Sequence, residues 1–135
     1  MKYEIYIFEA GKTASFLKKA IAEYEKRLSR YCKISCHFVK KQREWDKITE
    51  QNPERITVTA GKGSVSSEMF AKQIRQWESG GRGKLVFCIS EKVPEDSCQV
   101  CNLSDFTMSC KMTAMVLYEQ IYRGYRILHH HPYHK

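Results

Sequence analysis

The sequence predicts a single α/β domain with a mostly parallel sheet and flanking helices. Strand-like runs alternate with segments of helical period along the chain, an order that favours right-handed crossovers between parallel strands. The 135 residues are 42% hydrophobic, which is enough for one domain with its own core. Seven glycines and three prolines are few for a disordered chain. We therefore treat residues 1–135 as one domain.

The first half of the chain is predicted to contain three strands and one long helix. Residues 2–8, 33–39 and 55–59 have strand character. A helix is predicted to open at Gly11 to Thr13, because apolar residues recur every three or four positions after it. These residues are Phe16, Leu17, Ala20, Ile21, Tyr24, Leu28 and Tyr31. Residues 40–54 are charged without a clear period, so we expect a connection with at most a short helical turn.

The second half is predicted to contain two helices and two further strands. Ser66 or Ser67 can cap the first of these helices, and Gly80 and Gly81 can end it. The apolar stripe of this helix is Phe70, Ile74 and Trp77. Residues 84–89 are the most strand-like run, and 105–110 favour a short strand. A last helix is predicted over 113–128, with Met115, Leu117, Ile121, Tyr125 and Leu128 available for burial.

This order of elements predicts where a ligand binds. In open parallel sheets, ligands lie beyond the carboxyl ends of the strands. The loops that follow Thr59, Ile89 and Cys110 are therefore the expected binding loops. Gly61-Lys62-Gly63-Ser64 has neither the first glycine nor the spacing of a phosphate-binding loop, and we interpret it as a plain turn.

The charge balance indicates a polyanionic partner. The net charge is +8 and the sequence pI about 9.2, which favours nucleic acid over a merely basic solvated surface. No run approaches the eighteen apolar residues of a membrane span, and the first residues have no signal-peptide core. We expect a cytoplasmic protein whose six cysteines are reduced thiols.

Cys98 and Cys101 are spaced as in zinc and redox sites. A structural zinc needs four ligands, and Cys110 or the histidines within 129–134 would have to complete the set. Incidental cysteines that pack as small apolar residues are the favoured alternative, so we expect no metal.

The carboxyl terminus has an unusual composition for a chain end. Four of the five histidines lie in the last seven residues, together with Tyr133 and Lys135. Chain ends without a docking role are usually polar and poorly ordered. An aromatic, cationic end predicts a segment that docks and presents charge to an anion. The interruption by Pro132-Tyr133 argues against an engineered histidine tag.

The residue pattern of the carboxyl terminus resembles a known family. Glu119-Gln120-Ile121-Tyr122-Arg123 followed by Tyr133-His134-Lys135 is similar to the ending of the bacterial large-subunit ribosomal RNA methyltransferases that modify N3 of a pseudouridine. These enzymes are small members of the SPOUT superfamily. Further matches lie in family order at Ala20–Leu28, 56–58, 66–68 and 111–113. The resemblance covers nearly the whole chain.

The resemblance implies a five-stranded parallel α/β fold with a carboxyl-terminal trefoil knot. It implies an S-adenosylmethionine-dependent homodimer that methylates ribosomal RNA, alone or in the assembled ribosome. By position, the cofactor-binding residues would be Val58, Ser90, Ser109, Cys110, Lys111, Met112 and Thr113. The catalytic residues, facing the RNA and the target base, would be Arg123, Tyr133 and His134. His134 could accept the N3 proton, while Tyr133 orients or stacks on the base.

The chain departs from the family pattern at three places, which defines an alternative function. Ser90-Glu91-Lys92-Val93-Pro94 stands where the family usually has a glycine-rich loop, and a Pro-His element before the last helix is missing. The connection between the second and third strands is also short, as if a helix were missing. The alternative is a divergent, non-catalytic RNA-binding paralogue that has lost the cofactor.

Overall fold

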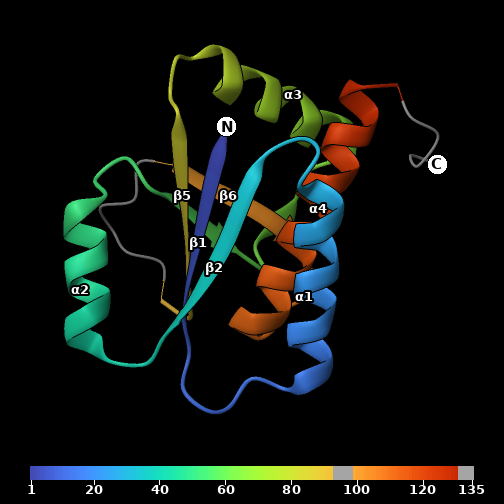
Figure 1. The fold of residues 1–135 in the computed structure, drawn as a ribbon. Helices are drawn as coiled ribbons and strands as arrows, with labels where there is room; N and C mark the ends of the chain where they lie inside the picture. Colours follow the sequence, from blue (N-terminus) through green and yellow to red (C-terminus); the bar gives the residue numbers. More distant parts are fainter. Residues whose placement is uncertain (93–98, 131–135) are drawn as a thin grey trace.

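A six-stranded sheet with four helices forms the part of the chain that the computed structural model describes, residues 1–92 and 99–130 (Figure 1). The strand order is β2-β1-β5-β3-β6-β4. The strands are β1 (Lys2–Phe8), β2 (Lys33–Val39), β3 (Ile56–Thr59), β4 (Gly63–Ser64), β5 (Lys84–Ser90) and β6 (Gln99–Ser104). The helices are α1 (Ser15–Leu28), α2 (Gln42–Gln51), α3 (Ser67–Ser79) and α4 (Cys110–Leu128).

The sheet is parallel except at one edge. β1 pairs in parallel with β2 and β5, and β3 pairs in parallel with β5 and β6. The two-residue strand β4 runs antiparallel to β6. The predicted α/β class with a mostly parallel sheet is confirmed, and the trefoil knot stays a prediction. None of the helices in the described ranges combines the length and the apolar character that a membrane crossing needs.

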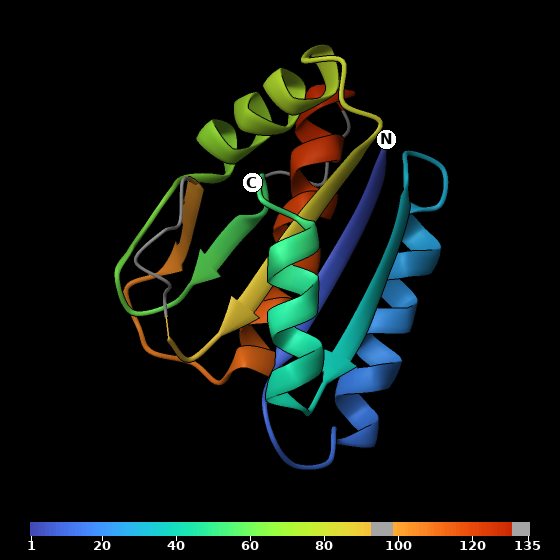
Figure 2. The ribbon, with the colours of Figure 1, turned by 90° about the vertical axis from the view of Figure 1, so that its left-hand side faces the viewer.

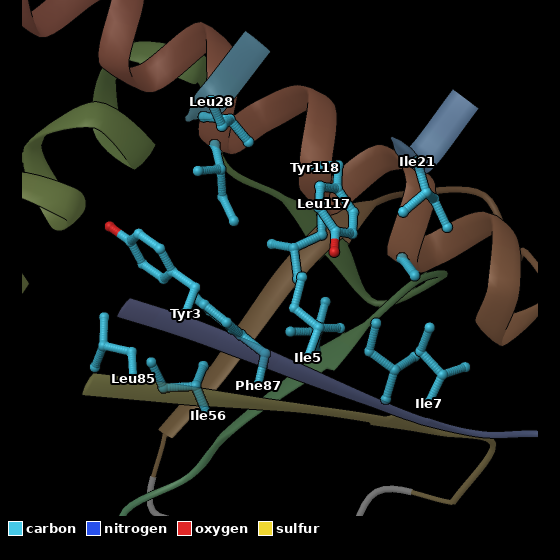
Figure 3. Close-up of a cluster of buried hydrophobic side chains, with 14 of the residues drawn as sticks. Tyr3, Ile5, Ile7, Ile21, Leu28, Ile56, Leu85, Phe87, Leu117 and Tyr118 are labelled. Carbon is cyan, nitrogen blue, oxygen red and sulfur yellow. The ribbon is translucent and has the colours of Figure 1, made fainter. Parts of the chain in front are cut away.

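The helices cover the two faces of the sheet unequally. α1, α3 and α4 lie on one face, and α2 lies on the other (Figures 1 and 2). The main core fills the three-helix side, where Leu117 and Tyr118 of α4 lie between the sheet and α1 (Figure 3). A smaller apolar cluster of Val39, Trp45, Val86 and Cys88 lies between α2 and the sheet.

Local signals explain both ends of α3 and the start of α4. The Ser66 hydroxyl accepts a hydrogen bond from the Met69 amide at 3.1 Å, which confirms the predicted cap of α3. That helix ends before Gly81, whose φ of +80° suits glycine. The Ser109 hydroxyl accepts a hydrogen bond from the Met112 amide at 3.1 Å and caps α4, which begins at Cys110, three residues before the predicted start.

Polar contacts hold α4 against the sheet. The hydroxyls of Tyr3 and Tyr125 are 2.9 Å apart, and Tyr125 donates to the carboxylate of Glu78 at 2.8 Å. Tyr118 donates to the carboxylate of Glu25 on α1 at 2.7 Å. Because Tyr3, Tyr118 and Tyr125 are all buried, these bonds satisfy hydroxyls that water cannot reach. The position of α4 is therefore fixed along its length.

Three sequence predictions about the elements were wrong. Residues 42–51 form α2, although a connection with at most a short helical turn was expected there. Packing of Trp45 against the sheet stabilises this otherwise mostly polar segment as a helix. The strand expected at 105–110 is β6 at Gln99–Ser104, and Cys110 already belongs to α4. Phe16, counted in the apolar stripe of the first helix, is 68% exposed because Leu17 occupies the core-facing position.

Candidate functional site

The candidate site is a cavity at the carboxyl ends of three parallel strands. Its volume is about 460 Å³, within the range of small-molecule sites. β3 and β5 contribute their last residues, and the turn between β6 and α4 closes the third side. The lining consists of residues 58–60, 89–91 and 107–110 together with Glu9, Lys62 and Thr113.

The structure brings together most of the residues for which a cofactor role was predicted. Val58, Ser90, Ser109, Cys110 and Thr113 all line this one cavity. They come from three segments that are far apart in the sequence, as the parallel-sheet rule requires. Their role in cofactor binding stays a prediction, which this shared location supports.

Lys111 and Met112 are placed differently. The Lys111 side chain is buried and donates to the backbone oxygen of Gly11 at 3.1 Å, which ties α4 to the loop after β1. Met112 is 39% exposed, and neither residue is among those that line the cavity. Their position next to the cavity fits a supporting role for the turn better than contact with a ligand.

Glu9 is a cavity residue that no sequence motif revealed. Its carboxylate accepts hydrogen bonds from the amides of Cys110 at 3.0 Å and Lys111 at 3.3 Å. A negative charge there interacts favourably with the positive end of the α4 dipole. The available signal was its place directly after the first parallel strand, at the edge where ligands bind.

Two of the cavity loops approach each other closely at Gly61. Its φ is +85°, and its amide donates to the Ser104 oxygen at 2.7 Å. A Cβ at this position would lie 2.7 Å from the Thr107 Oγ1 atom and 3.3 Å from the Thr107 Cα atom. A glycine is therefore required, both for the left-handed backbone and for the contact. The turn also carries Lys62 to the cavity, a role that the interpretation as a plain turn did not include.

A larger cavity lies elsewhere and fits the fold rule less well. It has a volume of about 660 Å³ and is lined by α3 and by the first residues of β3 and β6, Ile56 and Gln99. These residues mark the amino ends of parallel strands. Ligand sites of open parallel sheets lie at the opposite edge, so we place the candidate site in the smaller cavity.

Burial raises the pKa of three thiols, of which Cys110 lines the candidate cavity. Burial raises the pKa of Cys88 and Cys110 to about 12 and that of Cys101 to about 11. The thiolate is the form that binds metals and attacks disulfides, so none of these three thiols is suited to either chemistry at neutral pH. Within 1–92 and 99–130, no group of three or more His, Cys, Asp or Glu side chains could hold a metal ion. Cys98 lies outside the described residues.

These thiols predict a loss of stability at high pH. Above the ordinary thiol pKa of 9.0, the unfolded chain releases protons that the native thiols keep. The unfolded state then binds fewer protons, so the free energy of unfolding falls as pH rises toward the native pKa values. We expect a lower urea midpoint at about pH 10.5 than at about pH 8. Replacing Cys88 with valine should flatten this dependence, and equal midpoints in the parent would contradict the prediction.

Arg123, the only predicted RNA-facing residue within the described ranges, lies away from the cavity of its own chain. Arg123 is on α4, where it pairs with Glu119 at 3.2 Å and contacts the Ser67 hydroxyl at 3.5 Å. It follows Cys110 by thirteen residues, which corresponds to about 20 Å of helix. Tyr133 and His134 lie outside the described residues. Their catalytic role stays a prediction.

Aromatic packing fixes the end of α4. The Tyr125 ring is stacked on Tyr31 with centroids 5.2 Å apart, and His129 lies 5.1 Å from Tyr31. Tyr122 packs edge-on against Tyr24 at 5.9 Å. Tyr122 and Tyr125 both pack at the end of this helix. These ring contacts therefore hold the carboxyl-terminal end of α4 in place.

Comparison with known proteins identifies one family over the whole chain. The family described as "Predicted SPOUT methyltransferase" matches residues 1–134. A protein of Thermoanaerobacter sp., "Ribosomal RNA large subunit methyltransferase H 1", is 32% identical over 136 residues that cover all of both chains. A "Ribosomal RNA large subunit methyltransferase H" of Acetivibrio thermocellus is 28% identical over 158 residues, covering 97% of this chain and 99% of the relative. One of Exiguobacterium sp. is 32% identical over 157 residues, with the same coverage.

The alignment lengths show how the length of this chain compares with the lengths of its relatives. The Thermoanaerobacter protein matches end to end over 136 residues, so it has nearly the same length. The alignments with the other two relatives run to 158 and 157 residues. The short overall length of this chain is therefore shared with at least one relative that carries the methyltransferase name.

Proposed function

The chain belongs to the SPOUT methyltransferase family, and from this we propose that it transfers a methyl group from S-adenosylmethionine to N3 of a pseudouridine in large-subunit ribosomal RNA. The observation that carries the proposal is the cavity at which three loops from separate parts of the chain meet. The names of the relatives supply the substrate class. We expect the protein to act in the cytoplasm, on ribosomal RNA or on the assembled ribosome.

The cavity residues fit the chemistry of S-adenosylmethionine. Val58, Ile89 and Met108 supply apolar surface for an adenine ring. Lys62 supplies a positive charge for the carboxylate of the methionine part, while Glu9 and Glu91 supply negative charge for its ammonium and sulfonium groups. A cavity of about 460 Å³ can enclose most of such a molecule.

The side chains of the protein would bind the cofactor, orient the target base and remove its N3 proton. When bound, the cofactor supplies an activated methyl group on a positively charged sulfur. The N3 atom of pseudouridine is an imide nitrogen that loses its proton with modest help, so correct placement contributes much of the rate. We propose that the imidazole of His134 accepts this proton and that Tyr133 orients the base.

A second copy of the chain would bring these groups to the cavity. Arg123 lies about 20 Å along α4 from the cavity residue Cys110, so it does not complete the site of its own chain. We therefore propose a homodimer in which Arg123 and the carboxyl-terminal residues of one protomer serve the cavity of the other. Sedimentation at micromolar concentration should give the mass of two chains.

Two measurements test the proposed activity. Calorimetry should show binding of S-adenosylmethionine, and labelled methyl groups should appear in large-subunit RNA at N3 of one pseudouridine. Both naked RNA and ribosomes should be offered as substrate. No cofactor binding at millimolar concentration would contradict the enzyme and favour the non-catalytic RNA-binding paralogue.

We expect Arg123→Ala to weaken RNA binding. Loss of one phosphate contact should lower the affinity for ribosomal RNA severalfold and reduce the salt dependence of the binding constant by about one counterion. Filter binding at several salt concentrations gives both numbers. Arg75→Ala is a matched control, because Arg75 is exposed on α3. Equal affinity and equal salt slope in Arg123→Ala and the parent would contradict a role in RNA binding.

A further inference from the structure

We propose that the cavity beneath α2 receives the pyrimidine nucleotide whose base is methylated. This inference rests on the proposed function and names the place of its substrate. A methyl group transfers only to an atom about 3 to 3.5 Å away, so the target base must enter a space that opens onto the cofactor cavity. The cavity beneath α2 shares Glu9, Ser90 and Glu91 with that cavity. The larger cavity beside α3 shares none of its lining residues.

The position of α2 creates this space. α2 crosses the face of the sheet opposite to α1, α3 and α4, above the strands β1 and β5 (Figure 2). The cavity lies between this helix and the carboxyl ends of those two strands and has a volume of about 550 Å³. That is ample for one nucleotide, whose base must leave its stack for an enzyme to reach it.

One wall of the cavity is aromatic. The rings of Phe8 and Trp45 are stacked, with centroids 5.1 Å apart and an angle of 14° between their planes. Trp45 is only 6% exposed and packs on the apolar cluster beneath α2, so the wall is held in place. Flat aromatic surfaces are the usual partners of unstacked bases in RNA recognition.

The rest of the lining is mostly polar and includes both positively and negatively charged side chains. Lys40 and Lys92 are exposed at the cavity and suit a phosphate. Gln42 and Asp46 are joined by a hydrogen bond of 2.7 Å and offer a donor and acceptors. A pyrimidine imide presents a donor flanked by two carbonyl acceptors, so its edge is complementary to this mixture.

Tryptophan fluorescence can report on this cavity directly, because the chain has only two tryptophans. Trp77→Phe leaves Trp45 as the reporter, and Trp45→Phe leaves Trp77, which lines the cavity beside α3. We expect uridine 5′-monophosphate at millimolar concentration to quench the fluorescence of Trp77→Phe but not that of Trp45→Phe. Adding Lys40→Ala to Trp77→Phe should raise the dissociation constant about threefold. Lys41→Ala is the matched control, because Lys41 is exposed next in the chain but does not line the cavity.

A second ligand separates this inference from the proposed function. Saturating S-adenosylhomocysteine should change the dissociation constant of uridine 5′-monophosphate less than twofold. Competition between them would show that the cavity belongs to the cofactor and would overturn the inference. Absence of quenching in Trp77→Phe, with methyl transfer to ribosomal RNA intact in the parent, would also overturn it. Quenching without methyl transfer would support the nucleotide cavity and contradict the proposed enzyme.

Discussion

Replacing Gly61 with valine is expected to raise the dissociation constant for S-adenosylmethionine about tenfold or more. The new side chain would start 2.7 Å from the Thr107 Oγ1 atom and 3.3 Å from the Thr107 Cα atom, so the loops after β3 and β6 would have to separate. The residues on both sides of this contact line the candidate cofactor cavity. Calorimetry of the purified variant measures the effect.

Gly81→Val is the matched control for this substitution. Gly81 has a φ of +80°, close to the +85° of Gly61, but a Cβ there meets nothing within 4 Å. Both valines carry the cost of a left-handed backbone, about 1 to 2 kcal/mol of stability. Cofactor affinity should therefore fall in Gly61→Val alone. A similar affinity in both variants would mean that the contact between the two loops does not shape the cofactor site.

Leu117→Ala is expected to cause the largest loss of stability, about 2 to 5 kcal/mol. The Leu117 side chain is fully buried on α4, in the core between the sheet and α1 (Figure 3). Truncation removes apolar contacts and leaves a cavity that rigid neighbours cannot fill. The urea midpoint should fall sharply, while the slope of the free energy of unfolding against urea concentration stays the same.

Met69→Ala tests whether burial causes this effect. Methionine is close to leucine in size, but Met69 is 62% exposed on α3. Its truncation should change the free energy of unfolding by no more than about 0.5 kcal/mol. If both alanine variants lose similar stability, the loss comes from shortening any helical side chain and not from burial. The proposed packing of Leu117 would then be wrong.

The sequence predicted elements well where local patterns are strong. The run 84–89 corresponds to β5, and the Ser66 cap and the Gly80-Gly81 stop both hold for α3. Prediction failed where tertiary contacts decide. α2 has mostly exposed, charged residues and is stabilised by Trp45 packing on the far face of the sheet, a contact absent from the local pattern.

The sequence predicted only part of the candidate site, because some of its residues are brought there by tertiary contacts. The order of strands and helices identified the carboxyl edge, and Val58, Ser90 and Ser109 meet there. Glu9 and Lys62 belong to no motif, and their place in the cavity depends on how the loops fold over it. The family, by contrast, was recognisable from the chain alone, because it depends on residue identity at successive positions and not on how the loops fold.

By itself, the sequence determined the α/β class, the family and the edge of the sheet that carries the candidate site. These properties follow from hydrophobic period, strand order and residue identity, all of which are local or sequential. The tertiary structure decided that α2 stands alone on one face, that Glu9 binds the first turn of α4, and that two cavities meet at Glu9, Ser90 and Glu91. Those properties depend on contacts between residues as far as 101 positions apart, whose energies come from packing and hydrogen bonding in three dimensions.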